Sequence, residues 1–253
     1  IKIIMHFFYG VKNSLFKSEL QIPLFKNREF FLKNDYLLCK CFIKNDKWQF
    51  EKLKKKIIQK KFFVLKNEDF SNDDFFFLIK EKDFDKLNEE ELKEIEKFPV
   101  RSNLKIYLDN GGFSSYQSEY PYGMVEGKGS VTAAIGSLTN IDAENNFLLF
   151  RNILKNPIKE KFKSYLVNIK SNKKVHEYEL YTNTTNVLEI DKYFIKPEIY
   201  FVSGKYLGVP SFLSVNNKHI SLEHTHPPHA YILNSKKFYL VKKLKDKLNE
   251  IIN

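Results

Sequence analysis

Short apolar runs separated by turn residues, at about ten-residue spacing, constrain the second part of this chain more than any other feature. The turns between them carry pairs such as Ser203-Gly204 and Asn216-Asn217, which favour tight connections between antiparallel strands. Six short strands at this spacing are typical of a sandwich of the immunoglobulin-like type. The six runs are 162–169, 175–181, 187–190, 198–202, 209–215 and 219–224.

Glycine and proline divide the chain into two parts of different character. Residues 1–98 contain only Gly10 and Pro23, whereas the later residues contain the remainder of the 9 glycines and 8 prolines. Because these residues punctuate strands and turns, we predict an α+β fold whose composition changes near Pro99. The predicted domains are an N-terminal mixed α/β region at 1–98 and a β-sandwich-like domain with a C-terminal amphipathic helix at 99–253.

The N-terminal part shows both strand-like and helix-like patterns. A helix is predicted at 47–60, because Asp46 can cap it and apolar residues recur at helical spacing. A second helix is predicted at 88–98, where Asn88 and Glu91 form a capping box. Strands are predicted at 1–8, 36–43, 62–65 and 75–79.

The last residues predict an amphipathic helix that begins at about Lys236. Apolar side chains recur on one face of this helix and lysines lie on the other. Such a helix could dock on the core, cap an interface between two copies, or lie on an acidic membrane surface. The sequence shows no internal repeat. The apolar positions of the helix are Phe238, Val241, Leu244, Leu248 and Ile251.

Composition and charge limit the classes of function. The 253 residues are 43% hydrophobic and 29% charged, values that exclude intrinsic disorder and fibrous repeats. The net charge of +11 would attract phosphates, anionic glycans or an acidic membrane face. Arginines are scarce, so the guanidinium groups that form paired hydrogen bonds with phosphate or guanine are nearly absent. Specific nucleic-acid recognition is therefore not expected. We expect a small-molecule or glycan ligand, with peripheral membrane contact or a homo-oligomer as open alternatives.

Apolar stretches and cysteines indicate a cytoplasmic protein. No stretch approaches the roughly 18 apolar residues that a membrane-spanning helix needs, and no signal peptide is recognised. Cys39 and Cys41 are the only cysteines, and two cysteines make neither a disulfide framework nor a zinc site. We therefore expect a reducing, cytoplasmic setting and no transmembrane segment.

Three histidines lie close together near the end of the last predicted strand. If the strand at 219–224 continues, His224 and His226 point to one face and Glu223 points to the other. The two prolines that follow end the strand and hold His229 near its end. Neutral imidazoles in this arrangement could bind Zn, Fe or Mn. The predicted metal ligands are therefore His224, His226 and His229.

A second cluster of polar and aromatic side chains occupies the segment 111–124, which we expect to be a loop after a strand at 104–108. Tyrosine rings offer flat apolar faces for sugar rings or bases. Amide and carboxylate groups beside them offer planar hydrogen-bonding partners, so the mixture suits a carbohydrate. The predicted substrate contacts are Ser114, Tyr116, Gln117, Ser118, Tyr120 and Tyr122.

The leading hypothesis joins the two clusters into the site of an enzyme that acts on a sugar-like or other polar anionic substrate. His224 and His226 would serve as acid and base or as metal ligands, with Glu119 and Glu223 as orienting carboxylates. Two alternatives keep the histidines out of catalysis: they could bind a substrate anion, or form a solvated turn. A competing hypothesis is a non-catalytic glycan-binding or assembly module of β-sandwich type, in which the tyrosines form a stacking platform.

Overall fold

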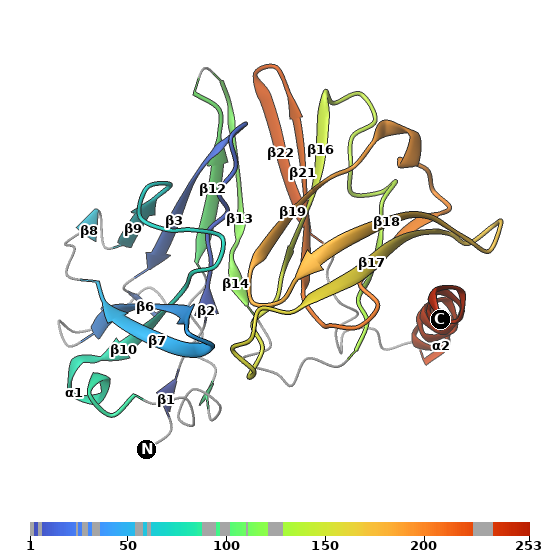
Figure 1. The fold of residues 1–253 in the computed structure, drawn as a ribbon. Coiled ribbons are helices and arrows are strands. Elements are labelled where there is room, and N and C mark those ends of the chain that lie inside the picture. Colours follow the sequence, from blue (N-terminus) through green and yellow to red (C-terminus); the bar gives the residue numbers. More distant parts are fainter. Residues whose placement is uncertain are drawn as a thin grey trace.

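The chain folds mainly into antiparallel β-sheets (Figure 1). The described residues contain two α-helices, α1 (Glu81–Phe84) and α2 (Ser235–Ile252), and the short 3₁₀ helix η2 (Lys192–Phe194). The predicted α+β class with a mixed α/β N-terminal region is therefore wrong, because strands dominate the described N-terminal part as well. The computed structural model describes residues 3–4, 7–23, 25–26, 30–31, 36–53, 58–59, 62–87, 95–96, 102–109, 111–120, 129–224 and 235–253.

The first half of the chain forms two five-stranded sheets, which we call the N-terminal sandwich. The first sheet has the order β14-β2-β10-β6-β7 and the second has the order β13-β12-β3-β9-β8. Since β12 pairs with β3 and β14 pairs with β2, while β13 pairs with β12, the sheets of the N-terminal sandwich contain strands from both sides of residue 98. The strands are β2 (Phe7–Phe8), β3 (Lys17–Pro23), β6 (Tyr36–Lys44), β7 (Lys47–Lys52), β8 (Ile58–Gln59), β9 (Phe62–Lys66), β10 (Phe75–Lys80), β12 (Asn103–Tyr107), β13 (Phe113–Gln117) and β14 (Glu119–Tyr120). Two short pairs accompany them, β1 (Ile3–Ile4) with β11 (Ile95–Glu96) and β4 (Phe25–Lys26) with β5 (Phe30–Phe31).

The second half forms two four-stranded sheets, which we call the C-terminal sandwich. One sheet has the order β15-β20-β17-β18 and the other has the order β19-β16-β21-β22. The six strands predicted between residues 162 and 224 are confirmed as β17 to β22. The strands are β15 (Thr132–Ala134), β16 (Asn145–Arg151), β17 (Lys161–Asn168), β18 (Lys173–Tyr181), β19 (Thr185–Glu189), β20 (Ile199–Val202), β21 (Val209–Asn216) and β22 (His219–His224).

The two sandwiches repeat one strand order. When β2, β3, β6, β7, β9, β10, β12 and β13 are matched in chain order with β15 to β22, every pairing among the first set has a counterpart in the second. For example, β10 lies between β2 and β6, as β20 lies between β15 and β17, and all four pairs are antiparallel. The N-terminal copy adds β8 and β14 at its sheet edges. The structure therefore contains an internal repeat that the sequence does not reveal.

The helix predicted at 47–60 is wrong over β7, which forms a hairpin with β6. The two turn residues, Asn45 and Asp46, have φ angles of 53° and 55°. Two successive positive φ angles are typical of the two-residue turn that joins twisted antiparallel strands, so Asp46 is a turn residue and not a helix cap. Trp48 follows the turn and packs its ring edge against Phe75, with 5.2 Å between ring centroids.

Other expectations for the N-terminal part have mixed outcomes. The strands predicted at 36–43, 62–65 and 75–79 are confirmed as β6, β9 and β10. The helix predicted at 88–98 is wrong at β11, and its other residues lie outside the described part of the chain. The loop expected at 111–124 is wrong where β13 and β14 form.

The first sheet of the N-terminal sandwich is buried on both faces, and β10 shows why its sequence lacks alternation. Phe76 packs into one apolar cluster with Phe8, while Phe75 and Phe77 pack into another with Phe7. A strand covered on both sides has apolar residues at consecutive positions. Cys39 and Cys41 are also buried in this sheet, and they form no disulfide bond with each other.

The two sandwiches meet along an apolar region that we call the seam. Leu104 and Ile106 of β12 pack there against Leu149 of β16 and Leu213 of β21. The edge strands β13 and β22 lie side by side, which Figure 1 shows near the middle of the molecule. The buried members of the seam are Val11, Phe16, Leu104, Ile106, Phe147, Leu149, Leu213, Val215 and Leu222.

A buried arginine also joins the sandwiches. The Arg151 side chain is 0% exposed, and its Nη1 donates to the carbonyl oxygen of Asn72 in the N-terminal sandwich at 2.5 Å. Its Nε and Nη2 atoms have no hydrogen-bond partner. The rings of Tyr9 and Phe75 lie 5.9 and 6.0 Å from its Cζ. Burial lowers the pKa of Arg151 to about 10, because desolvation disfavours the cation.

The predicted C-terminal helix is confirmed as α2, which packs on the outer side of the C-terminal sandwich (Figure 1). Leu248 is fully buried there in one cluster with Val167 and Val202. Neither helix of the described residues is long and apolar enough to cross a membrane.

Candidate functional site

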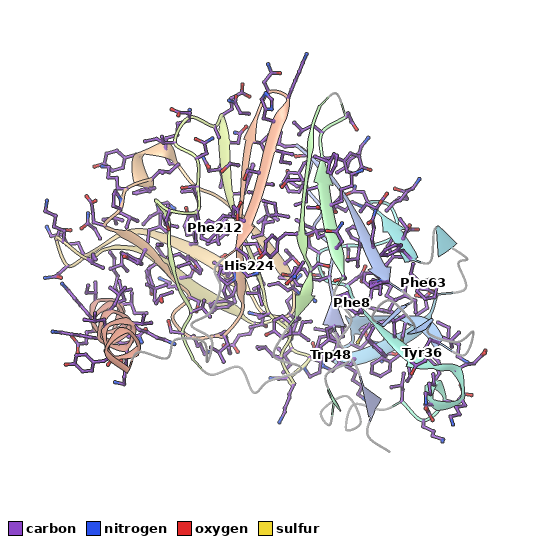
Figure 2. The ribbon with its side chains drawn as sticks, turned by 180° about the vertical axis from the view of Figure 1, so that it is seen from behind. Phe8, Tyr36, Trp48, Phe63, Phe212 and His224 are labelled. Carbon is purple, nitrogen blue, oxygen red and sulfur yellow. The ribbon has the colours of Figure 1, made fainter. Side chains whose placement is uncertain are left out.

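Three of the predicted site residues meet at the seam, where β13 lies beside β22. The rings of Tyr116 and His224 pack edge to face, with 4.2 Å between centroids and 78° between planes. Ser114 Oγ accepts a hydrogen bond from the backbone N–H of Leu222 at 3.1 Å. Figure 2 shows His224 between the two sandwiches, so their contact brings these distant segments together.

Other predicted site residues lie away from this contact. Glu223 is exposed and follows the alternation of β22, opposite to the buried Leu222. Ser118 is fully buried and its Oγ pairs with that of Ser102 at 2.7 Å. Tyr120 is buried in the core of the N-terminal sandwich. Glu119 belongs to β14, and its side chain lies outside the described residues.

The predicted metal ligands are only partly covered by the structure. His226 and His229 lie outside the described residues, as does Tyr122. Within the described part of the chain, no group of three or more His, Cys, Asp or Glu side chains is placed to hold a metal ion. A site for Zn, Fe or Mn that uses His224 therefore stays a prediction.

Gln117 belongs to a different surface, the solvent-facing side of β3, β12 and β13. In these strands Leu20, Leu104 and Ile106 are buried toward the core, so the alternate residues point outward. We call this surface the open face. It consists of Lys17, Glu19 and Gln21 from β3, Asn103, Lys105 and Tyr107 from β12, and Phe113, Ser115 and Gln117 from β13.

Cross-strand register arranges the open face in rows of like chemistry. Tyr107 is paired with Phe113 at one end, which makes an aromatic row. Asn103 is paired with Gln117 and with Gln21 at the other end, which makes an amide row. Directly paired residues of antiparallel strands have neighbouring side chains, so each row presents its groups together.

Hydrogen bonds orient the amide row. Gln21 Nε2 donates to Glu19 Oε1 at 2.6 Å, and Asn103 Nδ2 donates to Gln21 Oε1 at 3.4 Å. These bonds fix which end of each amide donates and which accepts. The row therefore offers a defined pattern of donors and acceptors to a ligand.

Lysine and aromatic side chains are in contact at the other end of the open face. Lys105 Nζ lies 4.7 Å from the ring centroid of Phe113 and 5.4 Å from that of Tyr107. Phe113 is 64% exposed. Lys17 Nζ pairs with Asp109 at 2.6 Å, and this hydrogen bond raises the pKa of Lys17. The Lys105 ammonium group therefore lies beside an accessible aromatic ring.

The corresponding face of the C-terminal sandwich is not open. Its strands β16 and β21 place Phe147, Leu149, Leu213 and Val215 in the seam. The same side of the repeated sheet is thus buried and apolar in one copy, and accessible, polar and aromatic in the other.

Sequence reasoning missed most of the open face because it missed β3. The stretch Lys17–Pro23 alternates exposed or half-buried polar residues with buried ones, which is the period-two signal of a half-buried strand. Lys105 and Tyr107 alternate in the same way with Leu104 and Ile106. That alternation could have identified the open face.

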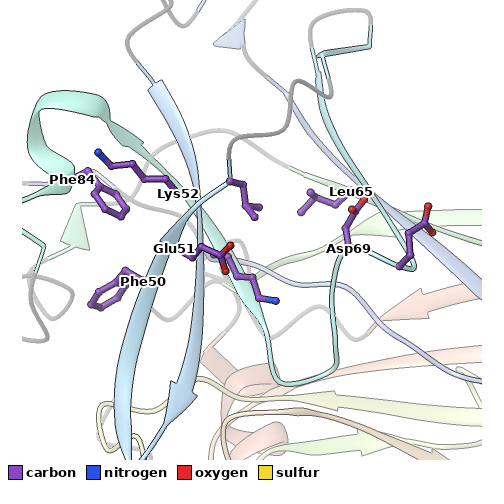
Figure 3. A pocket seen from close by; sticks show the side chains of 9 residues that line it. Phe50, Glu51, Lys52, Leu65, Asp69 and Phe84 are labelled. Carbon is purple, nitrogen blue, oxygen red and sulfur yellow. The ribbon is translucent and has the colours of Figure 1, made fainter.

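A pocket of about 780 Å³ lies beside β7 and β9 (Figure 3). Lys40 Nζ on its rim is paired with Asp74 at 2.9 Å, and Lys52 Nζ is paired with Asp85 at 3.5 Å. Because both lysines are already paired with carboxylates, the residues that line the pocket do not favour a ligand of one particular charge. The lining residues are Lys40, Phe50, Glu51, Lys52, Leu53, Leu65, Glu68, Asp69 and Phe84.

Comparisons of the chain with protein-family models, with curated proteins and with solved structures found no match in any of the three. The fold defines a tandem β-sandwich protein, and the open face is an accessible sheet face of its N-terminal sandwich.

Proposed function

We propose that the chain is a non-catalytic module that binds a glycan on its open face. The observation that supports this proposal is the aromatic row of Phe113 and Tyr107 on the same sheet face as the oriented amides. Sugar rings have apolar faces that stack on aromatic rings, and hydroxyl groups that pair with amides and carboxylates. The open face supplies both kinds of partner on one accessible surface.

The charge of the open face favours a neutral or acidic glycan. Lys105 is held beside the aromatic rings, where its ammonium group can donate to a sugar hydroxyl or a uronic-acid carboxylate. The net charge of +11 adds a long-range attraction for acidic chains.

Binding has more support than catalysis among the described residues. The enzyme hypothesis needs a carboxylate on the same side as His224, whereas Glu223 follows the opposite side of β22. Tyr116, a predicted stacking residue, has its ring against His224 and packs on the seam. The enzyme hypothesis depends on His226 and stays a prediction.

The test is a glycan screen with the full chain on an array of immobilised neutral and acidic glycans. The glycan with the strongest signal is then titrated by isothermal calorimetry. Phe113→Ala is expected to raise Kd by roughly 3- to 10-fold, the effect of losing one aromatic stack. Because Phe113 is 64% exposed, its truncation leaves the core intact.

Tyr193→Ala is the matched control. Tyr193 is 68% exposed on the C-terminal sandwich, and Lys196 Nζ lies 4.0 Å from its ring centroid, so it reproduces the lysine–aromatic contact elsewhere. Its loss should leave Kd unchanged. Absence of glycan binding, or equal weakening by both variants, would refute the proposal. Loss of activity in His224→Ala on a retained glycan would favour the enzyme hypothesis, and a changed oligomeric state in Phe113→Ala would favour an assembly surface.

We keep the cytoplasm as the proposed location. This rests on Cys39 and Cys41, which are buried and form no disulfide bond with each other, as expected of thiols in a reducing compartment.

A further inference from the structure

The aromatic row and the amide row lie at opposite ends of the open face. Tyr107 and Asn103 are four residues apart in β12, and a strand rises about 3.4 Å per residue. About 14 Å of sheet surface therefore separates the two rows. One sugar of a linked chain spans roughly 5 Å, as standard bond lengths require. A single sugar can thus contact one of these rows, whereas three consecutive sugars are needed to contact both.

The residues between the two outer rows leave them accessible to one ligand. Lys105 is paired with Ser115 and with Glu19 across the sheet, and we call these three residues the middle row. Lys105 Nζ lies near the rings of the aromatic row, and the carboxylate of Glu19 accepts from Gln21 in the amide row. Ser115 is short and exposed. The long side chains of the middle row therefore lean toward the two ends of the open face.

The strands, and not the rows, combine the different kinds of group. Along β12 the outward residues are Tyr107, Lys105 and Asn103, so the strand carries an aromatic ring, an ammonium group and an amide in turn. On β13, Phe113 lies at the aromatic end and Gln117 lies at the amide end. A ligand that crosses the strands would meet the chemistry of a single row, whereas a ligand that follows the strands meets all three rows.

We propose that the open face binds an extended, β-1,4-linked glycan lengthwise along β12 and β13, through at least three consecutive sugars. This inference rests on the proposed function and adds the length and shape of the glycan. Linkages between equatorial positions keep such a chain extended, so its rings can present apolar faces to the sheet. When one sugar stacks on Phe113, the third sugar lies beside Asn103, where the amide can pair with its hydroxyl groups.

The test uses β-1,4-linked oligomers of glucose and of mannuronic acid, with one to six sugars, titrated into the full chain by isothermal calorimetry. The two series represent the neutral and the acidic glycans that the charge of the open face favours. In at least one series, Kd should fall about 10-fold or more from the monosaccharide to the trisaccharide. From the trisaccharide to the hexasaccharide, Kd should change by less than about 4-fold, because the added sugars extend beyond the three rows.

Two variants locate the ends of the bound chain. Phe113→Ala should weaken the binding of oligomers of every length. Asn103→Ala should raise the Kd of the trisaccharide by about 3- to 10-fold and leave that of the disaccharide unchanged, because a disaccharide stacked on the aromatic row ends before the amide row. Gln21→Ala removes the other oriented amide and gives the same measurement if Asn103→Ala does not fold. Tyr193→Ala, the control on the C-terminal sandwich, should bind each oligomer like the wild type.

The outcomes separate this inference from the proposed function. Equal affinity for one sugar and for three, no binding of either series, or equal weakening of the disaccharide and the trisaccharide by Asn103→Ala would overturn the inference. In each of these cases the proposed function stands if another glycan of the array binds and Phe113→Ala weakens that binding. An array on which no glycan binds would refute the proposed function itself.

Discussion

Replacing Arg151 with methionine should stabilise the protein. Arg151 is 0% exposed, and two of its three guanidinium nitrogens have no hydrogen-bond partner. Asp73 and Asp74 attract the cation, but their ion pairs are with Lys159 and Lys40, so the buried cation loses its hydration and receives little in return. Methionine fills a similar shape, is flexible enough to follow it, and carries no charge.

The size of the effect follows from the surroundings of Arg151. Burial lowers its pKa to about 10, which corresponds to about 3 kcal/mol against the folded cation. The contacts with the rings of Tyr9 and Phe75, near the distance limit, offset about 1 kcal/mol. The carbonyl oxygen of Asn72 stays satisfied without Arg151, because it also accepts from Thr185 N at 2.8 Å and Thr184 Oγ1 at 3.1 Å. We expect a gain of about 1–2 kcal/mol.

Thermal and urea unfolding at pH 7 would measure the gain, which should raise the Tm of Arg151→Met by about 2–8 °C. Arg151→Lys keeps the charge and shortens the reach to Asn72, so it should be the least stable of the three proteins. Lys170→Met, at an exposed turn position, controls for the loss of one positive charge and should change stability by less than about 0.5 kcal/mol.

The advantage of Arg151→Met should depend on pH. The folded-state pKa of Arg151 is depressed, so the cost of the cation is fully present below about pH 10. Between about pH 10 and 12.5 the folded wild type loses its proton before the unfolded chain does, and the stability of the wild type rises relative to the variant. A variant less stable than the wild type by 2 kcal/mol or more, or an advantage that grows above pH 10, would refute this reasoning.

Three further predictions concern thiols, a turn and a close contact. Burial raises the pKa of Cys39 to about 12, so neither it nor Cys41 should react with a maleimide or a disulfide reagent at pH 8 until denaturant is added; rapid labelling of the folded chain would contradict their burial. Asp46 has φ 55° in the β6–β7 turn, so Asp46→Gly should stabilise the chain by about 0.4–1 kcal/mol in urea unfolding, and a loss of stability would refute the turn geometry. A Cβ at Gly208 would lie 2.3 Å from Cζ of the buried Phe150, so Gly208→Ala should destabilise by about 1–3 kcal/mol; unchanged unfolding would mean that the ring can move aside.

The sequence predicted strands well where turn residues separate apolar runs. All six strands from β17 to β22 are found, and their turns include residues with positive φ such as Asn172, Gly204 and Asn217. The prediction failed where local patterns fit two structures. Phe50 matches a helical stripe with Leu53 and Ile57, but in β7 it packs on Phe77 of β10, which lies beyond β6 in the same sheet. Long-range burial therefore overrode the local pattern.

The repeat was not recognised from the sequence, because the two sandwiches share only the pattern of strand pairing. Val11 and Phe16 lie between β2 and β3 and pack in the seam, a role that follows from the contact between the copies and not from the repeat itself. The two copies also differ at their edges, where β8 and β14 extend the N-terminal sheets. Such pairings join residues that are far apart in the chain. They cannot be inferred from composition or from the spacing of residue types.

For the site, the sequence predicted that the segments of Tyr116 and His224 meet, and it missed the open face beside them. Tyr116 and His224 do touch, because the edge strands β13 and β22 lie next to each other where the two copies meet. Alternation then separates the residues of β13: Ser114 and Tyr116 turn to the seam, and Phe113 and Gln117 turn to solvent. In a loop, all of these side chains could face one ligand, whereas in a strand successive side chains point to opposite faces.

The residues that β12 and β13 expose give the strongest reason to look for function on the open face. In the C-terminal copy, the equivalent sheet face is filled by apolar residues such as Leu149 and Leu213, as its burial in the seam requires. In the N-terminal copy this face is not buried, so apolar residues are not required there. Charged residues alone would keep the face soluble. Instead, Phe113 is 64% exposed beside Tyr107 and Lys105. Solubility does not require an accessible aromatic ring at this position, whereas stacking on a ligand does.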